Sequence, residues 1–200
     1  MAAIQQYWFD VDRQVFPKGF DYTAAAMVWG AGAKYDTWFD QDPIIIHGIN
    51  FLPFTGGSLY LGLRPDYVNR NFDELYRQSK GVVTTWRDYA LMFLALGNPG
   101  KALELYREDP YFEPEFGNSK ALVYHWITNL AALGGHVDAT ITANVPTYAV
   151  FKADDRRTYV AFNPSAKRQT VTFSDATTLA VMPRQEAHTV VRLSKKIGGT

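Results

Sequence analysis

The stretch NSKALVYHWITNLAALGGHVDATITA, residues 118–143, sets the fold class, because the spacing of its apolar residues changes partway along it. Its first half has apolar residues three or four positions apart, as on one helix face, at Leu122, Trp126, Leu130 and Leu133. The pair Gly134-Gly135 closes that helix, and short runs rich in Thr and Val follow, as in strands. The sequence therefore predicts an α+β protein, with helices in residues 1–135 and a small antiparallel β-sheet region in residues 136–200.

Three more helices are predicted upstream of this stretch. Their limits come from capping and turn residues, namely Pro65 and Gly81, then Thr84 or Thr85 and Gly97, then Asn98-Pro99 and Asp109-Pro110. Asn118 or Ser119 is expected to cap the helix that follows. Amphipathic helices joined by short loops favour hairpin packing. Arg87 and Asp88 are interpreted as a pair on a helix surface, where an ion pair contributes little stability.

Six short runs past Gly135 show the two-residue period of strands. They cover residues 140–143, 147–152, 158–163, 169–173, 177–181 and 189–193. Turn residues separate them, for example Asp154-Asp155 and Asn163-Pro164-Ser165. The pattern predicts an antiparallel meander.

Composition excludes several classes of protein. The 200 residues suit one domain, or one with a small second, and 20 basic residues balance 20 acidic ones. This neutral balance, without a basic run, argues against a nucleic-acid partner. Cysteine is absent, which excludes disulfides and thiol catalysis. No apolar run reaches the ~18 residues of a membrane span, so no membrane partner is expected, and the first ten residues do not resemble a signal peptide.

Residues 29–62 form a ring-rich segment with no simple period. Seven aromatic residues lie among glycines and prolines there, namely Trp29, Tyr35, Trp38, Phe39, Phe51, Phe54 and Tyr60. Flat rings beside Asp, Asn and His suit a sugar-binding groove, because a pyranose has an apolar face and a rim of hydroxyls. Rings of this kind also fill cores, and composition leaves both interpretations open. His47 and Asn50 could bind sugar hydroxyls, or His47 could be a structural histidine.

Chemical motifs are few. The histidines His47, His125, His136 and His188 lie far apart without metal-ligand spacing, so we expect neither a metal nor another cofactor. Carboxylates remain as candidate acids and bases, because glycoside hydrolysis uses two of them. The candidates in loops are Asp36, Asp40, Asp42, Glu113 and Glu115. Twenty acidic residues would place some pairs close together by chance, so solvated loop carboxylates are the other interpretation.

Several longer motifs occur in a fixed order. They are YWFDVD at 7–12, MVWGAG at 27–32, HGINFLPFTGGSLYLG at 47–62, TWRD at 85–88 and YHWITNL at 124–130. PTYAVF at 146–151, TYVAFNPS at 158–165 and TVTFSD at 170–175 follow. Together they resemble the C-terminal part of glycoside hydrolase family 81, over roughly residues 4–193.

The resemblance implies an endo-β-1,3-glucanase that cuts internal laminarin-type linkages with inversion, and that acts outside the cell. The helices would be the later ones of an (α/α)6 toroid-type catalytic domain, and the strands a small sheet packed on it. The ring-rich segment would line the glucan cleft, with Trp29, Trp38, His47 and Asn50 as substrate-binding residues.

The chain also departs from the family pattern. The segments that carry the family's general acid Asp and base Glu do not occur here, and both belong upstream of YWFDVD. We therefore expect no catalytic residue in this chain, little activity from it alone, and the missing N-terminal part of the enzyme as a partner. The alternatives are a non-catalytic β-1,3-glucan-binding module and a helical domain whose ring-rich segment binds another protein.

Overall fold

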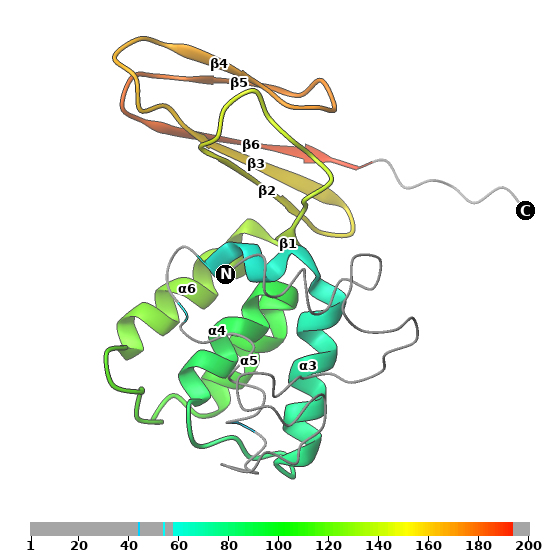
Figure 1. Cartoon of the computed structure of the whole chain (residues 1–200), viewed down its shortest axis with the longest axis vertical. Helices are drawn as coiled ribbons and strands as arrows, with labels where there is room; N and C mark the ends of the chain where they lie inside the picture. The colour runs from blue at the N-terminus through cyan, green and yellow to red at the C-terminus, as the bar shows by residue number, and fades with distance from the viewer. Residues whose placement is uncertain (1–43, 45–53, 55–57, 194–200) are drawn as a thin grey trace, which may run out of the picture. The chain divides into compact units, whose positions relative to one another are not determined.

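Helices come first along the chain and strands last in the computed structural model of this protein (Figure 1). It describes Ile44, Phe54 and residues 58–193, with Tyr60 described by its backbone alone. The helical elements are η2 (Ser58–Leu63), α3 (Pro65–Gln78), α4 (Arg87–Gly97), α5 (Pro99–Glu108) and α6 (Lys120–Leu133). This order is the α+β class that the sequence predicted. The chain divides into two compact units between Ala131 and Ala132, and each is described by itself.

Local signals place the starts of three helices. Pro65 and Pro99 are the first residues of α3 and α5, where the missing N–H has no intrahelical acceptor to lose. The Asn98 side chain caps α5 by accepting a hydrogen bond from the Lys101 N–H at 3.1 Å. Ser119 Oγ accepts from the Leu122 N–H at 3.2 Å and so caps α6. Each of these starts was predicted.

Helix α4 is buried around nearly its whole circumference. It packs against α3, α5 and η2, and every residue from Ala90 to Leu96 is buried. Gly97 lets α3 and α4 approach closely, since a Cβ there would lie 2.9 Å from Cγ1 of Val68. The amphipathic pattern predicted for this helix therefore accounts for only part of its buried surface.

The predicted cap of α4 is wrong. Neither Thr84 nor Thr85 caps it; the residue before the helix is Trp86, in the left-handed region with φ 50° and without a capping side chain. The reason is tertiary, because Asp88 in the first turn is buried and bonded to a distant loop. The hydrogen bonds of Asp88, rather than a local capping side chain, fix the backbone where the chain enters α4.

The predicted face of α6 is also wrong by part of a turn. The buried residues are Val123, Ile127 and Leu130, whereas Leu122 is 44% exposed. Trp126 orients the helix, because its Nε1 donates to the Met92 carbonyl at 3.0 Å and its ring meets Phe54 edge-on at 5.3 Å. Apolar residues surround α6, so their spacing alone could not select the buried side.

The second unit contains two antiparallel sheets. Its strands are β1 (His136–Val137), β2 (Tyr148–Lys152), β3 (Arg156–Phe162), β4 (Gln169–Thr172), β5 (Thr178–Val181) and β6 (Glu186–Arg192). One sheet has the order β1-β2-β3-β6, and β4-β5 form a separate hairpin. The meander prediction is therefore wrong at this point, because β6 pairs with β3, from Arg156 opposite Arg192 to Phe162 opposite Glu186.

The chain between α6 and β2 differs from the prediction as well. Residues 140–143 form no strand and make only the isolated bridge between Ala143 and Phe173. The edge strand is instead β1, directly after the glycine pair. A Cβ on Gly135 would collide with the Lys152 carbonyl, so glycine is needed for the chain to join β2 there.

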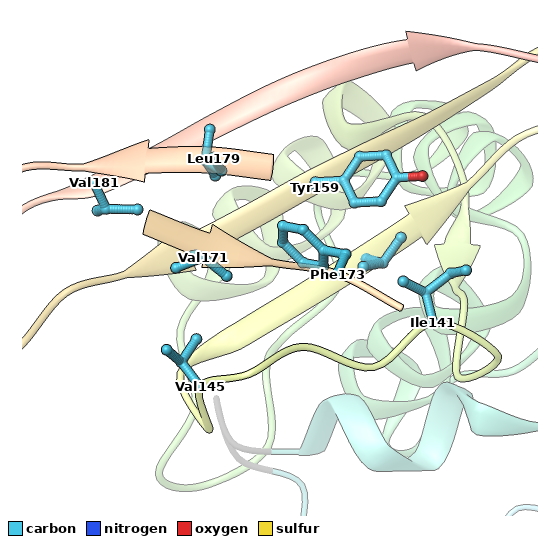
Figure 2. Close-up of a cluster of buried hydrophobic side chains, with 9 residues drawn as sticks. Ile141, Val145, Tyr159, Val171, Phe173, Leu179 and Val181 are labelled. Atoms are coloured by element: carbon cyan, nitrogen blue, oxygen red, sulfur yellow. The ribbon is translucent and has the colours of Figure 1, made fainter. Parts of the chain in front are cut away.

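The core of the second unit lies between the four-stranded sheet and the β4–β5 hairpin (Figure 2). Its buried members are Ile141, Val145, Val150, Tyr159, Ala161, Val171, Phe173, Leu179 and Val181. Phe173 meets the Tyr159 ring edge-on, with 4.9 Å between centroids. Alternate residues of β2 to β5 supply most of this core, as the two-residue period predicted. Burial between two layers gives these few strands a hydrophobic core of their own.

Candidate functional site

Most of the predicted site lies outside the described residues. This holds for Trp29, Trp38, His47 and Asn50, and for the carboxylates Asp36, Asp40 and Asp42. Phe54 belongs to the same ring-rich segment and is described: it is buried against Trp126. For this one ring, the core interpretation is the correct one. Glu113 and Glu115 are also described, and they lie in the loop between α5 and α6, hereafter the 109–119 loop.

A buried carboxylate anchors the 109–119 loop. Asp88 is fully buried, and its Oδ2 accepts hydrogen bonds from the Glu115 N–H at 3.0 Å and from Asn118 Nδ2 at 2.6 Å. Burial, together with the negative charges of Asp88 and Glu115, raises the pKa of the Tyr89 phenol. The interpretation of Asp88 as a surface residue is therefore wrong. Its carboxylate accepts the hydrogen bond from the Glu115 N–H that a backbone carbonyl would accept in a helix or sheet.

Arg87 fixes the other end of the same loop. Its Nη2 donates to the Leu105 carbonyl at 2.9 Å, and its Nε lies 3.7 Å from Asp109 Oδ2. The side chain is only 11% exposed. Arg87 Nε and Asp88 Oδ1 are buried and have no hydrogen-bond partner within the described part of the chain. Adjacent residues of the TWRD motif thus hold the loop at two points.

A cavity of about 400 Å³ opens between the 109–119 loop and the turn after α3. Its wall includes Tyr76, Thr84, Arg87, Asp109, Phe112 and Glu113. The volume falls within the range of small-ligand sites, roughly 300–1,000 Å³. A lining that mixes rings, a hydroxyl and both signs of charge suits a hydroxylated ligand better than a purely apolar one.

The two loop carboxylates have different surroundings. Glu113 is 92% exposed and lies 4.0 Å from Lys120 Nζ, which is a surface ion pair. Glu115 contributes its backbone N–H to the Asp88 anchor. These contacts describe a solvated carboxylate and a loop support. They favour the solvated interpretation over that of a catalytic pair.

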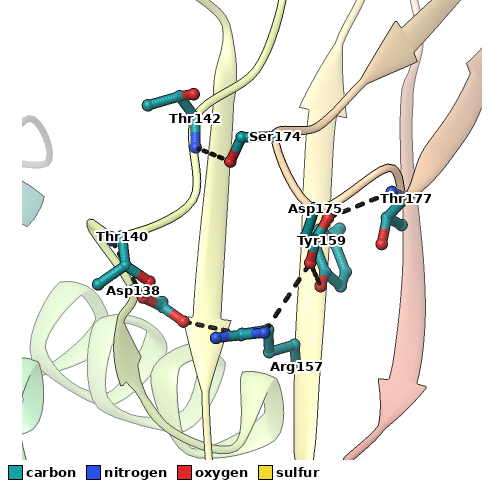
Figure 3. Close-up of polar contacts among 8 residues, drawn as sticks. All are labelled: Asp138, Thr140, Thr142, Arg157, Tyr159, Ser174, Asp175 and Thr177. Atoms are coloured by element: carbon teal, nitrogen blue, oxygen red, sulfur yellow. Dashed lines mark hydrogen bonds and ion pairs between the residues drawn. The ribbon is translucent and has the colours of Figure 1, made fainter.

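A second polar centre lies in the sheet unit (Figure 3). Asp138, 6% exposed, accepts from Arg157 Nε at 2.8 Å through Oδ2 and from Thr140 Oγ1 at 2.5 Å through Oδ1. Arg157 Nη1 also lies 3.9 Å from Asp175 Oδ2, to which the Tyr159 hydroxyl donates at 2.5 Å. The network ties the segment before β2 to β3 and to the β4–β5 turn. Spacing along the sequence did not reveal it, because the pairs that meet across strands are 16 to 19 residues apart.

The network shifts the pKa of both carboxylates downward. Burial alone would raise the pKa of Asp138, but hydrogen bonds from Thr140 and Arg157 together lower it. Asp175 behaves alike, because burial is outweighed by hydrogen bonds from Tyr159 and Thr177 and by the charge of Arg157. Burial and the bond to Asp175 raise the pKa of the Tyr159 phenol.

We expect the sheet unit to lose stability on acidification. A carboxyl whose pKa is lowered by folding stabilises the folded state above its unfolded pKa, about 3.9, and that contribution disappears as the pH falls through the folded value. Asp138→Asn should flatten this dependence between about pH 5 and pH 2. Amide hydrogen exchange in β2 and β3, measured against pH, checks the expectation. Asp154→Asn, an exposed turn variant, is the control. Equal pH slopes for wild type and Asp138→Asn would contradict the assignment.

The remaining histidines show no shared site. His125 Nε2 lies 2.9 Å from Asn129 Nδ2 on an exposed turn of α6. His136 pairs with Lys152, and His188 lies opposite Val160. Within residues 58–193 and the two isolated described positions, no group of three or more potential ligands could hold a metal ion. No helix in that same part of the chain has the length and apolarity needed to cross a membrane.

Comparison with known proteins gives a consistent set of matches. Residues 1–127 match the glycosyl hydrolase family 81 C-terminal domain. A glucan endo-1,3-beta-D-glucosidase of Thermobifida fusca is 43% identical over 187 residues, which cover 93% of this chain and 24% of that protein. The same-named protein of Acetivibrio thermocellus is 38% identical over 200 residues, covering 100% of this chain and 26% of that protein.

A solved structure is similar as well. It is a mutant form of glycoside hydrolase family 81 from Clostridium thermocellum, with a TM-score of 0.79 and 38% identity. The match covers 94% of this chain and 26% of that one. This chain therefore spans about a quarter of the length of the curated relatives it matches.

Proposed function

Because this chain belongs to glycoside hydrolase family 81, we propose that it works as the C-terminal part of an endo-1,3-β-glucanase that hydrolyses internal bonds of β-1,3-glucan. The observation that carries the proposal is the identity of 43% and 38% to two glucan endo-1,3-beta-D-glucosidases across nearly the whole chain. Identity at this level is high enough for the fold to be shared. A polymeric substrate also makes an extracellular place of action part of the proposal.

The inverting mechanism suggests which part of the enzyme supplies the catalytic carboxyls and which part this chain supplies. Inverting hydrolysis needs an acid and a base carboxyl about 6.5–9.5 Å apart, with a water between them. We place both carboxyls in the part of the enzyme that precedes this region in the relatives. Residues 1–135 would supply later helices of an (α/α)6 toroid, and residues 136–200 the small sheet region. On its own the chain would then bind glucan without hydrolysing it.

The substrate cleft is proposed to include Trp29, Trp38, His47 and Asn50. Their residue types support this role, since rings stack on sugar faces and His and Asn address hydroxyls. Packing at the downstream end of their segment adds support. Phe54 is buried against Trp126, and Gly62 lies so close to Leu96 that a Cβ there would be 3.1 Å from its Cβ. The helical core thus holds the end of the proposed cleft segment.

A chimeric enzyme tests the proposal. In the Thermobifida fusca relative, the segment that matches this chain is replaced by residues 1–200, and released reducing ends are measured on laminarin. We expect the chimera to hydrolyse laminarin, and both residues 1–200 alone and the relative without the segment to be inactive. Loss of one catalytic carboxyl alone costs about 10²–10⁴ in rate, so the difference should be large.

Two outcomes would contradict the proposal. A chimera that folds and binds laminarin but releases no reducing ends would favour the glucan-binding module instead. Clear hydrolysis by residues 1–200 alone would place the acid and base within this chain. The carboxylates to substitute next would then be Asp36, Asp40, Asp42, Glu113 and Glu115.

A further inference from the structure

Two aromatic side chains of the 109–119 loop lie exposed to solvent. Tyr111 is 84% exposed and Phe116 is 98% exposed, which makes Phe116 the most exposed large hydrophobic side chain of the described residues. Large apolar rings are usually at least half buried, because their exposure forfeits much of the hydrophobic stabilisation they could provide. Two such rings within six residues of one loop therefore point to a ligand.

The loop holds both rings in place. Asp109 Oδ1 accepts from the Tyr111 N–H at 3.2 Å, and the neighbouring Phe112 is buried edge-on against Tyr106 at 5.7 Å. Phe116 lies in the turn closed by the Asn118 N–H to the Glu115 carbonyl at 2.9 Å.

Hydrogen bonds to the buried Asp88 carboxylate hold the same turn. Gly117 allows its backbone conformation, because its φ of +89° lies in the left-handed region that favours glycine. The backbone on each side of both rings is thus fixed before any ligand arrives. Such preorganisation lowers the entropic cost of binding.

The charges around the rings select the chemistry of the ligand. Asp109 lies 3.7 Å from Arg87, and Glu113 lies 4.0 Å from Lys120. The loop therefore carries little net charge and no positive surplus that would attract an anionic ligand such as a phosphate. Charged residues are depleted at the core of protein interfaces, whereas here Glu113 and Glu115 lie between the two rings in the sequence. A neutral polysaccharide fits both features, because its sugar faces stack on rings and its hydroxyls donate to carboxylates.

We propose that the 109–119 loop is a glucan-binding surface, in which Tyr111 and Phe116 stack on sugar rings of a β-1,3-glucan chain. The carboxylates of Asp109 and Glu113, which line the cavity, accept hydrogen bonds from hydroxyl groups of the same glucan chain. The substrate class rests on the proposed function. The surface adds to the residues of the ring-rich segment, because it uses a different loop.

Affinity electrophoresis in native gels containing laminarin tests the surface, with residues 1–200 as the protein. Wild type is expected to be retarded. Tyr111→Ala and Phe116→Ala should each weaken binding by about 2- to 10-fold, the range for loss of one ring contact. The double variant should be retarded less than either single variant, with the remaining retardation supplied by the proposed cleft residues, and Phe116→Trp should be retarded as wild type. Phe162→Ala, which removes a ring that is 43% exposed on β3, is the matched control and should bind as wild type.

Three results would overturn the proposal. The first is that laminarin does not retard the wild type, and the second is that it retards the double variant as strongly as the wild type. The third is that the double variant differs from the wild type only in its size in gel filtration, which would indicate a protein interface. Circular dichroism confirms that each variant is folded. Failure here is separable from failure of the proposed function. A chimera that hydrolyses laminarin while the loop variants bind normally would refute only the loop surface. An inactive chimera beside ring-dependent retardation would refute only the hydrolase.

Discussion

Phe173→Ala is expected to destabilise the sheet unit by about 3–5 kcal/mol, the usual cost of removing a buried phenylalanine. Phe173 is 2% exposed and packs edge-on against Tyr159 and against Tyr148, at 4.9 and 6.0 Å. It therefore joins the β4–β5 hairpin to the four-stranded sheet through β2 and β3. Truncation would leave a cavity in the cluster of buried side chains that surrounds Phe173 (Figure 2).

The measurement must report on the sheet unit alone. All five tryptophans precede residue 132, so their fluorescence follows the first unit. Hydrogen exchange of peptides from residues 148–192 is the suitable readout. Phe162→Ala removes the same side chain from an exposed position, and should cost less than about 1 kcal/mol. If the two variants were equally stable, the core would not lie where the structure places it.

Asp88→Ala is the second substitution with a large expected effect, about 3 kcal/mol or more in the first unit. The variant leaves the Glu115 N–H and the Asn118 amide without their acceptor, and a hydrogen bond to a charged group contributes about 1.5–3 kcal/mol. The 109–119 loop should detach from α4. Asp88→Asn keeps one acceptor oxygen and should cost less.

Tryptophan fluorescence during urea unfolding measures this effect, because all five tryptophans lie in the affected unit. Asp73→Ala is the matched control: Asp73 pairs with Lys101 at 2.7 Å, but its side chain is 61% exposed. An exposed pair of this kind contributes under about 1 kcal/mol. A loss for Asp88→Ala as small as the control's would mean that the anchor does not hold the loop.

The sequence contained the local signals for most elements. These signals are proline at first helical positions, the Asn98 and Ser119 caps, and two-residue alternation in the strands. Each acts between residues close in the sequence, so it can be recognised from the sequence alone. The motif order likewise indicated the family that the comparisons then showed. The predicted substrate residues, Trp29, Trp38, His47 and Asn50, lie outside the described residues and stay predictions.

The candidate site in the described residues could not be predicted in this way. The Asp88 anchor joins positions 27 and 30 residues apart, and Arg157 reaches an aspartate 19 residues away. Asp88 looked like one of many surface carboxylates, because nothing in its neighbours shows that the loop returns to cover it.

The sequence by itself thus determined the α+β class, the helix starts and the alternation of the strands, because each depends on contacts within a few residues. Three features arose only when distant segments packed together: the rotation of α6 about Trp126, the left-handed entry at Trp86, and the pairing of β6 with β3. In each case contacts between near neighbours left two local arrangements open. Burial of a ring, a carboxylate or a strand edge against a remote partner selected one of them.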